Sequence, residues 1–439
     1  MKNCQSRRHI ALIGMLAIGV AACGAPEPEP VAPTPGLTAF TGARLIVGNG
    51  DAIESGTLVV RDGRIESVGP TENTNIPDDA TTVDLSGRTV TPGLINAHGH
   101  VNNVRGLESD PSFYTEGHVA DQLTLYANYG ITTVVSLGGD GPEGVAVRDR
   151  EDENLTHARL RVAGDVIVAD SPEQAAERVN AMADMNVDYI KIRVDDNLGT
   201  SQKMSPEIYQ TVIETAHSRN LELAAHLYYL EDAKGLLNAG ADFVAHSVRD
   251  EAVDEELIGL LKANNVCVSP TLMREVSTYV YETRPDFFDD PFFTKYADPG
   301  VLSVLEATEY QERIQNSQSA QTYKAQLEVA MQNVKALSDA GIRIAMGTDT
   351  GPAARFQGYF EHGELQLMVD SGLTPMQAIV ASTGDAASCM GLNEVGTLTS
   401  GKWADFVGYT GNPANNIADS HTIESVWVAG NAVPGASGN

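Results

Sequence analysis

From about residue 93 onward, the sequence alternates short apolar runs with amphipathic stretches of helical period, and this alternation constrains the fold most strongly. Eight apolar runs have the length of buried strands, at 94–98, 131–138, 159–168, 188–194, 221–227, 242–248, 265–272 and 342–349. Helical segments lie between them, such as 171–185, 205–220 and 229–240, and Ser-Pro pairs start the first two. This pattern predicts an α/β fold of the (β/α)8 TIM-barrel type over residues 93–395.

The segments on either side of the barrel have a different pattern of apolar and polar residues. Residues 37–92 alternate apolar and polar positions between Gly, Asn and Asp turns, and the same pattern returns at 396–435. We expect these two segments to combine into one small β-sandwich beside the barrel. An aromatic and acidic insertion at about 275–320 stands where the loop after the seventh strand belongs. The sequence leaves open whether this insertion is a lid or a packed excursion.

The first 22 residues have the features of an export signal. Three basic residues precede an apolar run at 10–22, which is too short to span a bilayer as a stable helix. The run ends in Val-Ala-Ala-Cys, similar to the lipobox of bacterial lipoproteins, and predicts lipidation of Cys23; an ordinary signal cleaved near Ala22 is the alternative. Residues 23–36 are Pro-rich and predict an extended tether. We therefore expect an exported protein, anchored by lipid to a bacterial membrane on the periplasmic face of the outer membrane.

Net charge limits the class of partner. With 29 basic and 59 acidic residues, the formal charge is −30, which argues against nucleic acid because phosphate binding needs basic surfaces. We expect a small-molecule or dipeptide substrate and membrane contact through the N-terminal lipid alone, and we leave a homo-oligomer open. Cys267 and Cys389 lie far apart in the barrel region and are expected to be buried free thiols.

Six residues that can bind a metal stand late in five of the predicted strands. They are His98 and His100 on the first, Lys191 on the fourth, His226 on the fifth, His246 on the sixth and Asp349 on the eighth. The first pair alone is ambiguous, because two residues one apart on a strand share a face whether or not they hold a metal. In a barrel, however, the carboxyl ends of the strands converge on one site. The six positions together therefore favour a metal centre.

These donors suit two divalent ions, and zinc best, since imidazole and carboxylate are its usual ligands. Lys191 can join them only as a neutral amine that has added carbon dioxide, because an ammonium group has no acceptor. The resulting carbamate would bridge both ions. The alternative for Lys191 is a buried strand-end lysine paired with Asp349.

The segments PGLINAHGH, DYIKIRV, AAHLY, FVAHS and GTDTG resemble the amidohydrolase superfamily, and within it the imidazolonepropionase-like group that includes Xaa-Pro and Xaa-Arg/Lys dipeptidases. The similarity extends over essentially residues 37–435. Single-metal members of the family lack the strand-four lysine, so Lys191 indicates the two-metal hydrolytic branch. The ligands that the resemblance implies are His98, His100 and Asp349 on one metal, His226 and His246 on the other, and N6-carboxylated Lys191 between them.

The expected reaction is hydrolysis of an amide C–N bond, in a dipeptide or an N-acyl amino acid. Two cations lower the pKa of a bridging water, which attacks the scissile carbonyl as hydroxide. Asp349 is expected to take the proton and pass it to the leaving amine. The alternative is a lactone, ester or phosphotriester hydrolase with the same centre, and a non-catalytic lipid-anchored binding protein is a third reading.

Tyr228 and His362 are candidates for contacts with the substrate. Tyr228 lies two positions after His226 on the same face and is expected to hydrogen-bond to the carbonyl or the tetrahedral intermediate, unless it packs on Tyr229. His362, in the loop after the eighth strand, is expected to act as a lid or substrate contact.

Two arginines are further candidates for substrate binding. Arg193 follows the strand-four lysine by two residues, and Arg249 follows the strand-six histidine by three. Either would pair with a substrate carboxylate through a bidentate contact. The alternative for both is pairing with the neighbouring carboxylates of Asp195, Asp196 or Asp250.

Overall fold

The computed structural model of the protein describes residues 34–436. The expected signal peptide, Cys23 and nearly all of the tether lie outside these residues. Within 34–436, no helix combines the length and the apolar character needed to cross a membrane.

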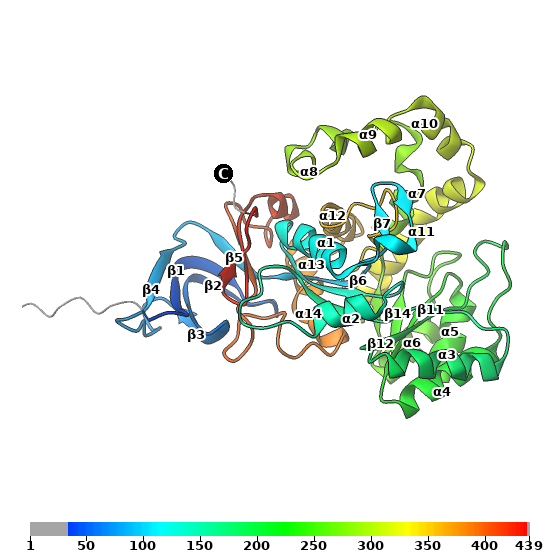
Figure 1. Ribbon diagram of the computed structural model, residues 1–439, viewed down its shortest axis with the longest axis horizontal. Helices are drawn as coiled ribbons and strands as arrows, with labels where there is room; N and C mark the ends of the chain where they lie inside the picture. Colours follow the sequence, from blue (N-terminus) through cyan, green and yellow to red (C-terminus); the bar gives the residue numbers. More distant parts are fainter. Residues whose placement is uncertain (1–33, 437–439) are drawn as a thin grey trace, which may run out of the picture.

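Parallel strands form the centre of the molecule (Figure 1). Within residues 34–436 they make two sheets, one in the order β10-β9-β6 and the other in the order β11-β12-β13-β14-β15. The bounds of these strands are β6 Leu94–Gly99, β9 Ile131–Ser136, β10 Arg159–Val162, β11 Val166–Ile167, β12 Tyr189–Arg193, β13 Glu222–His226, β14 Phe243–Ala245 and β15 Cys267–Ser269. The structure thus confirms a mixed α/β fold with parallel sheets.

Two of the expected strands differ from the prediction. The run at 159–168 is broken into β10 and β11, because Gly164 between them adopts a φ of +72°, which ends an extended strand. Residues 342–349 make no regular ladder and meet β15 only through an isolated bridge between Val268 and Ile344. Their few backbone hydrogen bonds to strands run to β15 on one side and to β6 on the other.

Hydrogen bonds link the segment 342–349 to both sheets. On one side, Ala345 N donates to Val268 O at 3.0 Å; on the other, Ala97 N of β6 donates to Met346 O at 2.8 Å. At the opposite join, Asp188 N donates to Val162 O at 2.8 Å and connects the two sheets between β10 and β12.

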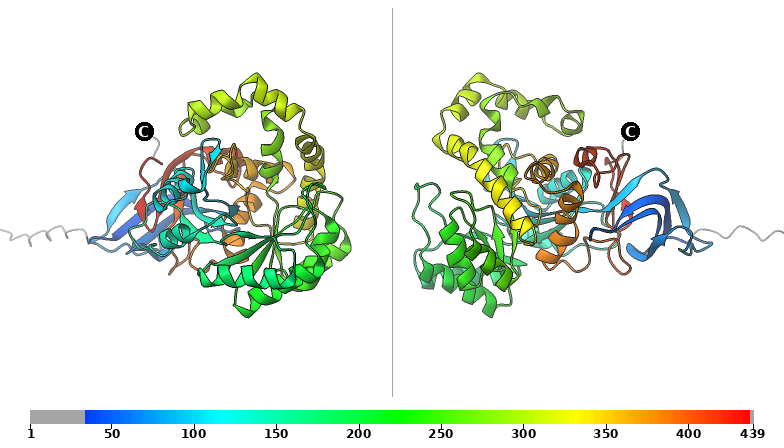
Figure 2. Two further views of the ribbon diagram at one scale, coloured as in Figure 1. Left: turned by 45° about the vertical axis from the view of Figure 1, so that its right-hand side comes forward. Right: turned by 180° about the vertical axis from the view of Figure 1, so that it is seen from behind.

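Helices surround the parallel strands (Figure 2). The helices that follow the central strands are α1 Glu116–Asn128, α2 Pro142–Arg148, α3 Pro172–Asp184, α4 Pro206–Ser218, α5 Leu230–Ala239, α6 Glu255–Asn264, α7 Leu272–Tyr279, α11 Gln318–Asp339, α12 Tyr359–Asp370, α13 Pro375–Ala381 and α14 Gly384–Cys389. In β12, Ile190 and Ile192 belong to the apolar layer between strands and helices, whereas Tyr189 belongs to the inner cluster. Because side chains alternate along a strand, Lys191 shares the inner face with Tyr189.

The helix boundaries follow from local sequence signals. Ser171 caps α3 by accepting a hydrogen bond from Gln174 N, and Pro172 takes the first helical position. Gly240, with a φ of +98°, ends α5 in a left-handed cap. These boundaries agree with the segments expected at 171–185 and 229–240.

The two terminal segments share one mixed sheet to one side of the parallel strands (Figure 1). Its order is β18-β17-β16-β5-β1-β2-β3, with β4 paired to β1. Antiparallel pairing of β5 with β16 joins the N-terminal to the C-terminal part. A sandwich of two facing layers stays a prediction. The bounds are β1 Leu37–Ile46, β2 Ala52–Arg61, β3 Arg64–Pro70, β4 Thr81–Asp84, β5 Thr89–Pro92, β16 Phe406–Tyr409, β17 Ile423–Val428 and β18 Asn431–Ala432.

The insertion after β15 forms an arch of short helices over the molecule (Figure 2). These are α8 Pro291–Thr294, α9 Pro299–Leu305 and α10 Thr308–Gln315. Tyr281, Phe288 and Phe293 are buried in a cluster of their own, which also contains Phe360 of α12. Between the two readings of the insertion, this separate core favours the packed excursion.

Cys267 and Cys389 form a disulfide, so the expectation of two free thiols is wrong. The bond joins the start of β15 to the end of α14 across 122 residues of sequence. Distance along the chain gave no hint of the pairing, because the fold brings the end of α14 beneath the strands, where Cys389 packs against the inner apolar cluster.

Candidate metal centre

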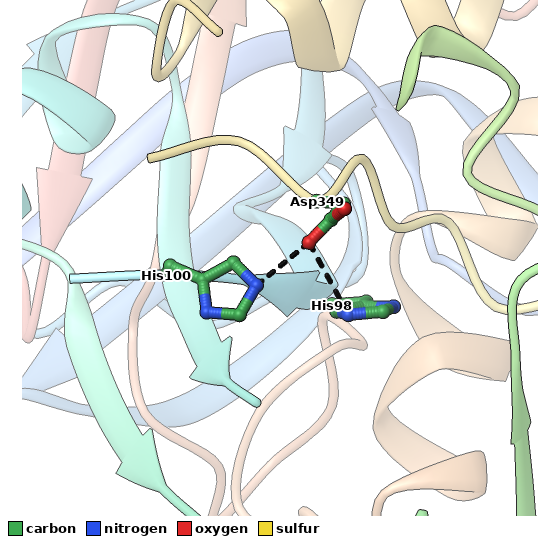
Figure 3. Close-up of side chains that lie close together, drawn as sticks. All are labelled: His98, His100 and Asp349. Carbon is green, nitrogen blue, oxygen red and sulfur yellow. Dashed lines mark hydrogen bonds and ion pairs between the residues drawn. The ribbon is translucent and has the colours of Figure 1, made fainter. Parts of the chain in front are cut away.

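His98, His100 and Asp349 converge at the carboxyl ends of the strands (Figure 3). Oδ1 of Asp349 lies 2.7 Å from Nε2 of His100 and 3.7 Å from Nε2 of His98. One donor atom of each residue falls within 4.8 Å of the others. The two histidines therefore do share a face, as their spacing on β6 requires.

The other three expected ligands adjoin this group. Nζ of Lys191 lies 3.2 Å from Nε2 of His98. The ring of His246 lies 4.5 Å from the ring of His98 and 4.2 Å from the ring of His226, measured between centroids. The structure thus brings all six strand-end residues into one continuous cluster.

Glycines allow the eighth segment to close onto the first strand. A Cβ on Gly347 would lie 2.3 Å from Oγ of Ser269 and 2.9 Å from the backbone N of His98. A Cβ on Gly351 would lie 2.7 Å from the backbone O of His100. Both approaches are too close for any larger residue, so the Gly-Thr-Asp-Thr-Gly run places Asp349 against the two histidines.

The backbone is strained at three positions of the centre. The φ angles are +90° at His246, +50° at Thr271 and +59° at Asp349, in the left-handed region that non-glycine residues rarely adopt. Strain of this kind costs on the order of 1–3 kcal/mol per residue and persists where surrounding contacts enforce it. It marks the strand ends as a functional site.

Neighbouring groups select which nitrogen of each histidine faces the cluster. Nδ1 of His100 donates to Gly138 O at 2.8 Å, and Nε2 of His226 donates to the carboxylate of Asp195 at 2.8 Å. Because both acceptors lack a proton, Nε2 of His100 and Nδ1 of His226 carry lone pairs in the neutral rings. Nδ1 of His246 bonds to Oγ1 of Thr271 at 2.6 Å. Nε2 is therefore the nitrogen of His246 that is left to face the cluster.

Burial keeps three of the histidines uncharged. It lowers the pKa of His226 to about 4 and the pKa values of His98 and His246 well below the usual range. Burial also lowers the pKa of Lys191 to about 7, so that a large fraction of its amine is neutral near neutral pH. Burial alone would raise the pKa of Asp349, but Arg355, His100 and His98 outweigh it and hold this carboxyl well below its usual range.

The donor set fits a divalent metal. Nε2 of His100 and Oδ1 of Asp349 lie 2.7 Å from each other, close enough to bind the same cation. Nδ1 of buried His98 has no hydrogen-bond partner within the described part of the chain. Neutral imidazoles, a carboxylate and a lysine of depressed pKa are the groups that would hold zinc-like ions here.

Two arginines at Asp349 were not anticipated. Nη1 of Arg355 forms a close ion pair with Oδ2 of Asp349, and Nε of Arg274 lies 3.9 Å from the same oxygen. Arg274 comes just after the seventh expected strand, a position that signals a strand-end residue. Arg355 lies in the irregular loop 350–358, where no periodicity points to it.

A cavity of about 780 Å³ opens beside the cluster. Tyr228 lines it, as expected of a substrate contact, and its hydroxyl bonds to Gln326 of α11. Its ring also packs edge-on against Tyr229 at 4.6 Å between centroids, as the alternative reading expects, and the contact with substrate stays a prediction. The complete lining is Asn197, Leu198, Thr200, Tyr228, Tyr229, Asp250, Arg274, Thr278, Gln318, Ser319, Thr322, Tyr323, Gln326 and Arg355.

The two other candidate arginines, Arg193 and Arg249, are not among the residues that line this cavity. Arg193 is half-buried at the end of β12 on the inner face. Arg249 is buried behind Tyr228, and its Nε lies 3.1 Å from Oε1 of Glu275, a partner that the sequence did not suggest.

His362 does not reach the cavity, and its expected role as lid or substrate contact is corrected. It is buried on α12, where Nε2 lies 2.8 Å from Tyr129 O and Nδ1 lies 3.0 Å from Oγ of Ser420. It lies in α12 rather than in a loop, and the helix turns this side chain toward the terminal sheet. The side chain therefore holds α12 in place.

Comparisons with known proteins agree with this geometry. A family model described as the amidohydrolase family matches residues 89–433. Imidazolonepropionase of Paracoccus denitrificans is 27% identical over 387 residues, which cover 80% of this chain and 87% of that protein.

Solved structures show the same architecture. A prolidase-like protein from Bifidobacterium longum superimposes with a TM-score of 0.74 at 26% identity, over 93% of this chain and 97% of that chain. A Xaa-Pro dipeptidase with bound methionine in its active site gives a TM-score of 0.72 at 20% identity, over 90% and 99% of the two chains. The second likeness bears on the fold alone. The arrangement is that of a TIM-barrel-type fold.

Proposed function

This chain belongs to the amidohydrolase family and is a hydrolase, and we propose that it cleaves the amide C–N bond of a dipeptide or an N-acyl amino acid with two divalent metal ions. The observation that carries the proposal is the convergence of six donor residues from five strand positions on one cluster beside a cavity of about 780 Å³. Membership of a hydrolase family sets aside the reading as a non-catalytic binding protein.

The ligand assignment follows the two halves of the cluster. His98, His100 and Asp349 would hold one ion, since their donor atoms already lie within 4.8 Å of one another. His226 and His246 would hold the other through Nδ1 and Nε2, the nitrogens that Asp195 and Thr271 leave open. Divalent ions such as zinc would supply a water of lowered pKa and polarise the scissile carbonyl.

Lys191 would link the two halves. Its neutral amine can add carbon dioxide and release one proton, and the carbamate then offers two oxygens in place of one ammonium group. Burial supports this step, because it lowers the pKa of Lys191 to about 7. In the alternative, a lysine simply paired with Asp349, the charge of Asp349 raises the pKa of Lys191 against the effect of burial, whereas the direct contact of Nζ is with His98.

Asp349 and Tyr228 would act on the substrate. Asp349 would take the proton of the attacking water and deliver it to the leaving amine. Tyr228 lines the cavity two residues after His226 and would donate its hydroxyl hydrogen to the carbonyl oxygen as negative charge develops there.

The backbone contacts also support a closed barrel. Hydrogen bonds join the two parallel sheets near Val162 and again through residues 342–349, so that each strand position has a neighbour on both sides. We take the barrel as residues 93–395 and the terminal sheet, 37–92 with 396–435, as a β-sandwich.

Export and lipid anchoring at Cys23 complete the proposal. The sequence of residues 1–23 motivates it, and the disulfide between Cys267 and Cys389 supports it, because such bonds form and persist outside the reducing cytosol. The formal charge of −30 accords with a small-molecule substrate rather than nucleic acid.

Metal content measured alongside turnover tests the proposal. We expect two metal ions per chain and hydrolysis of members of a library of dipeptides and N-acyl amino acids. His217→Gln, at an exposed histidine that bonds to Asp242, is the matched control and should change neither quantity. Turnover confined to lactones, esters or phosphotriesters would establish the alternative substrate class, and metal-independent turnover would refute the centre itself.

A further inference from the structure

Arginine side chains gather at the inner end of the cavity beside the metal cluster, and one carboxylate, that of Asp250, also lines this cavity. Three guanidinium groups gather there, those of Arg249, Arg274 and Arg355. Within residues 34–436, the carboxylates that pair with them are Glu275 and Asp349. If Asp349 serves as a metal ligand, its charge is shared with the ion, and it neutralises the neighbouring arginines less completely.

Two of these arginines share a single carboxylate. Nε of Arg249 lies 3.1 Å from Oε1 of Glu275, and Nη1 of Arg274 lies 3.1 Å from both of its oxygens. Arg249 and Glu275 are 1% exposed, and Arg274 is 9% exposed. Burying two cations against one anion is costly unless a second anion arrives.

Each of these two arginines has one donor group without a hydrogen-bond partner. Among the described residues, these groups are Nε of Arg274 and Nη2 of Arg249. Arg274 lines the cavity, whereas Arg249 lies behind Tyr228 with its guanidinium carbon 4.7 Å from the ring centroid. An anion that enters the cavity can therefore meet Arg274 directly.

Arg355 completes the binding surface from the opposite loop. It lines the same cavity, and its side chain is 20% exposed. Both Arg274 and Arg355 approach Oδ2 of Asp349, so the point between them lies next to the cluster that would hold the metals. A carboxylate bound there would stand close to the reacting amide.

The walls of the cavity are aromatic. Tyr228, Tyr229 and Tyr323 line it, and the guanidinium carbon of Arg274 lies 4.2 Å from the ring centroid of Tyr323. Nη2 of Arg274 also donates to the hydroxyl of Tyr323 at 3.3 Å, so this tyrosine holds the guanidinium in place. An apolar or aromatic side chain of a substrate would pack on the tyrosines.

We propose that Arg274 and Arg355 bind a free carboxylate of the substrate, so that the site selects acidic amides, namely N-acyl amino acids and dipeptides, over neutral amides. The inference rests on the proposed amide hydrolysis and deepens it. Arg274 and Arg355 then determine specificity in place of Arg193 and Arg249.

Matched compounds that differ only in the carboxylate test this inference on the zinc-loaded protein. One pair is N-acetyl-L-phenylalanine and N-acetyl-2-phenylethylamine, and the other is glycyl-L-phenylalanine and the 2-phenylethylamide of glycine. We would measure kcat/KM for compounds that are cleaved and Kd by calorimetry for those that are not. The acid of at least one pair should be favoured by roughly 10–100-fold, the usual effect of hydrogen bonds to a charged group.

Variants separate recognition from structural support. Arg274→Gln and Arg355→Gln should reduce the preference for the acid to below about threefold. The readout is the ratio between the two members of a pair, because both arginines also approach Asp349. Arg313→Gln on α10, whose side chain stacks on Tyr310 outside the cavity, is the control and should keep the full preference.

The outcomes distinguish the two proposals. Equal cleavage of acid and neutral compounds would overturn the carboxylate inference and leave amide hydrolysis intact. Arginine-dependent binding of the acids without cleavage of any amide would uphold the inference and refute the proposed reaction. Variants that weaken both members of a pair alike would assign the arginines a structural role and overturn the inference.

Discussion

The carboxylate of Asp195 lies 2.8 Å from Nε2 of His226 and directs the opposite ring nitrogen toward the metal cluster. Asp195 itself is 5% exposed, and although burial would raise its pKa, the hydrogen bond from His226 lowers it to about 2. The carboxylate thus stays charged near neutral pH and fixes the tautomer of the histidine.

Asp195→Asn should weaken zinc binding by roughly 10–100-fold, because the amide holds the ring of His226 less firmly and makes its nitrogen less basic. Competition with a chelator of known affinity would measure the change. Asp196→Asn, at the neighbouring carboxylate that accepts a hydrogen bond from Tyr229, is the control. Unaltered zinc affinity in the first variant would show that the contact has no positioning role.

Asp349→Asn should lower kcat by about 10²–10⁴-fold, the range for loss of a general acid–base group. Most of the bound metal should remain, because the other five ligands are intact. Metal analysis and turnover on the same preparation would check both statements. Turnover close to that of the unmodified protein would rule out Asp349 as the proton-transfer group.

Lys191 should control uptake of metal through its pKa of about 7. The neutral amine becomes the main form as the pH rises through 7, so reconstitution of metal-free protein with zinc should improve from pH 6 to pH 8 and require bicarbonate. Lys191→Ala should bind fewer than two ions at any pH. Reconstitution that is indifferent to bicarbonate would argue for direct binding without a carbamate.

Acid should destabilise the metal-free protein at its histidine cluster. Burial lowers the pKa of His226 to about 4, while the unfolded side chain titrates near 6.5. Below pH 6.5 the unfolded state therefore binds protons first, and the folded state loses stability as the pH falls from about 6.5 to 4, by about 3 kcal/mol for this group. Denaturant unfolding at several pH values would measure the loss, and His226→Gln should flatten the profile.

Reduction of the disulfide should lower the free energy of unfolding by about 2–5 kcal/mol, since it closes a long loop in the unfolded chain. Thermal unfolding with and without dithiothreitol would show the effect, and the Cys267→Ser, Cys389→Ser double variant should be insensitive to the reductant. Equal melting temperatures for the two proteins would mean that α14 is held by packing alone.

The strand-end histidines and Asp349 were predictable because barrel geometry converts a linear pattern into a spatial one. Lys191 followed from the same rule, and its burial on the inner face of β12 bears out the reasoning from alternation. Helix boundaries such as Ser171 and Gly240 were readable from capping chemistry alone.

Ion pairs that involve loop residues could not be predicted in this way. Arg355 lies in a loop and pairs with Asp349, and Arg249, which lies behind Tyr228, pairs with Glu275 of α7. His362 was misplaced because its position after the eighth strand suggested a loop, whereas it belongs to a helix that turns the side chain toward the terminal sheet. The disulfide depends on where α14 ends in space, which local sequence does not encode.

The pairing of β5 with β16 means that the terminal sheet can be completed only after the C-terminal part of the chain has been synthesised. Thr91 meets Val407 in that ladder, so the N-terminal half-sheet keeps an open edge until more than three hundred further residues have been synthesised. A nascent chain that stops short of β16 presents this edge to other chains. We therefore expect a protein truncated before β16 to be insoluble, so that loss of solubility is the first effect of C-terminal truncation.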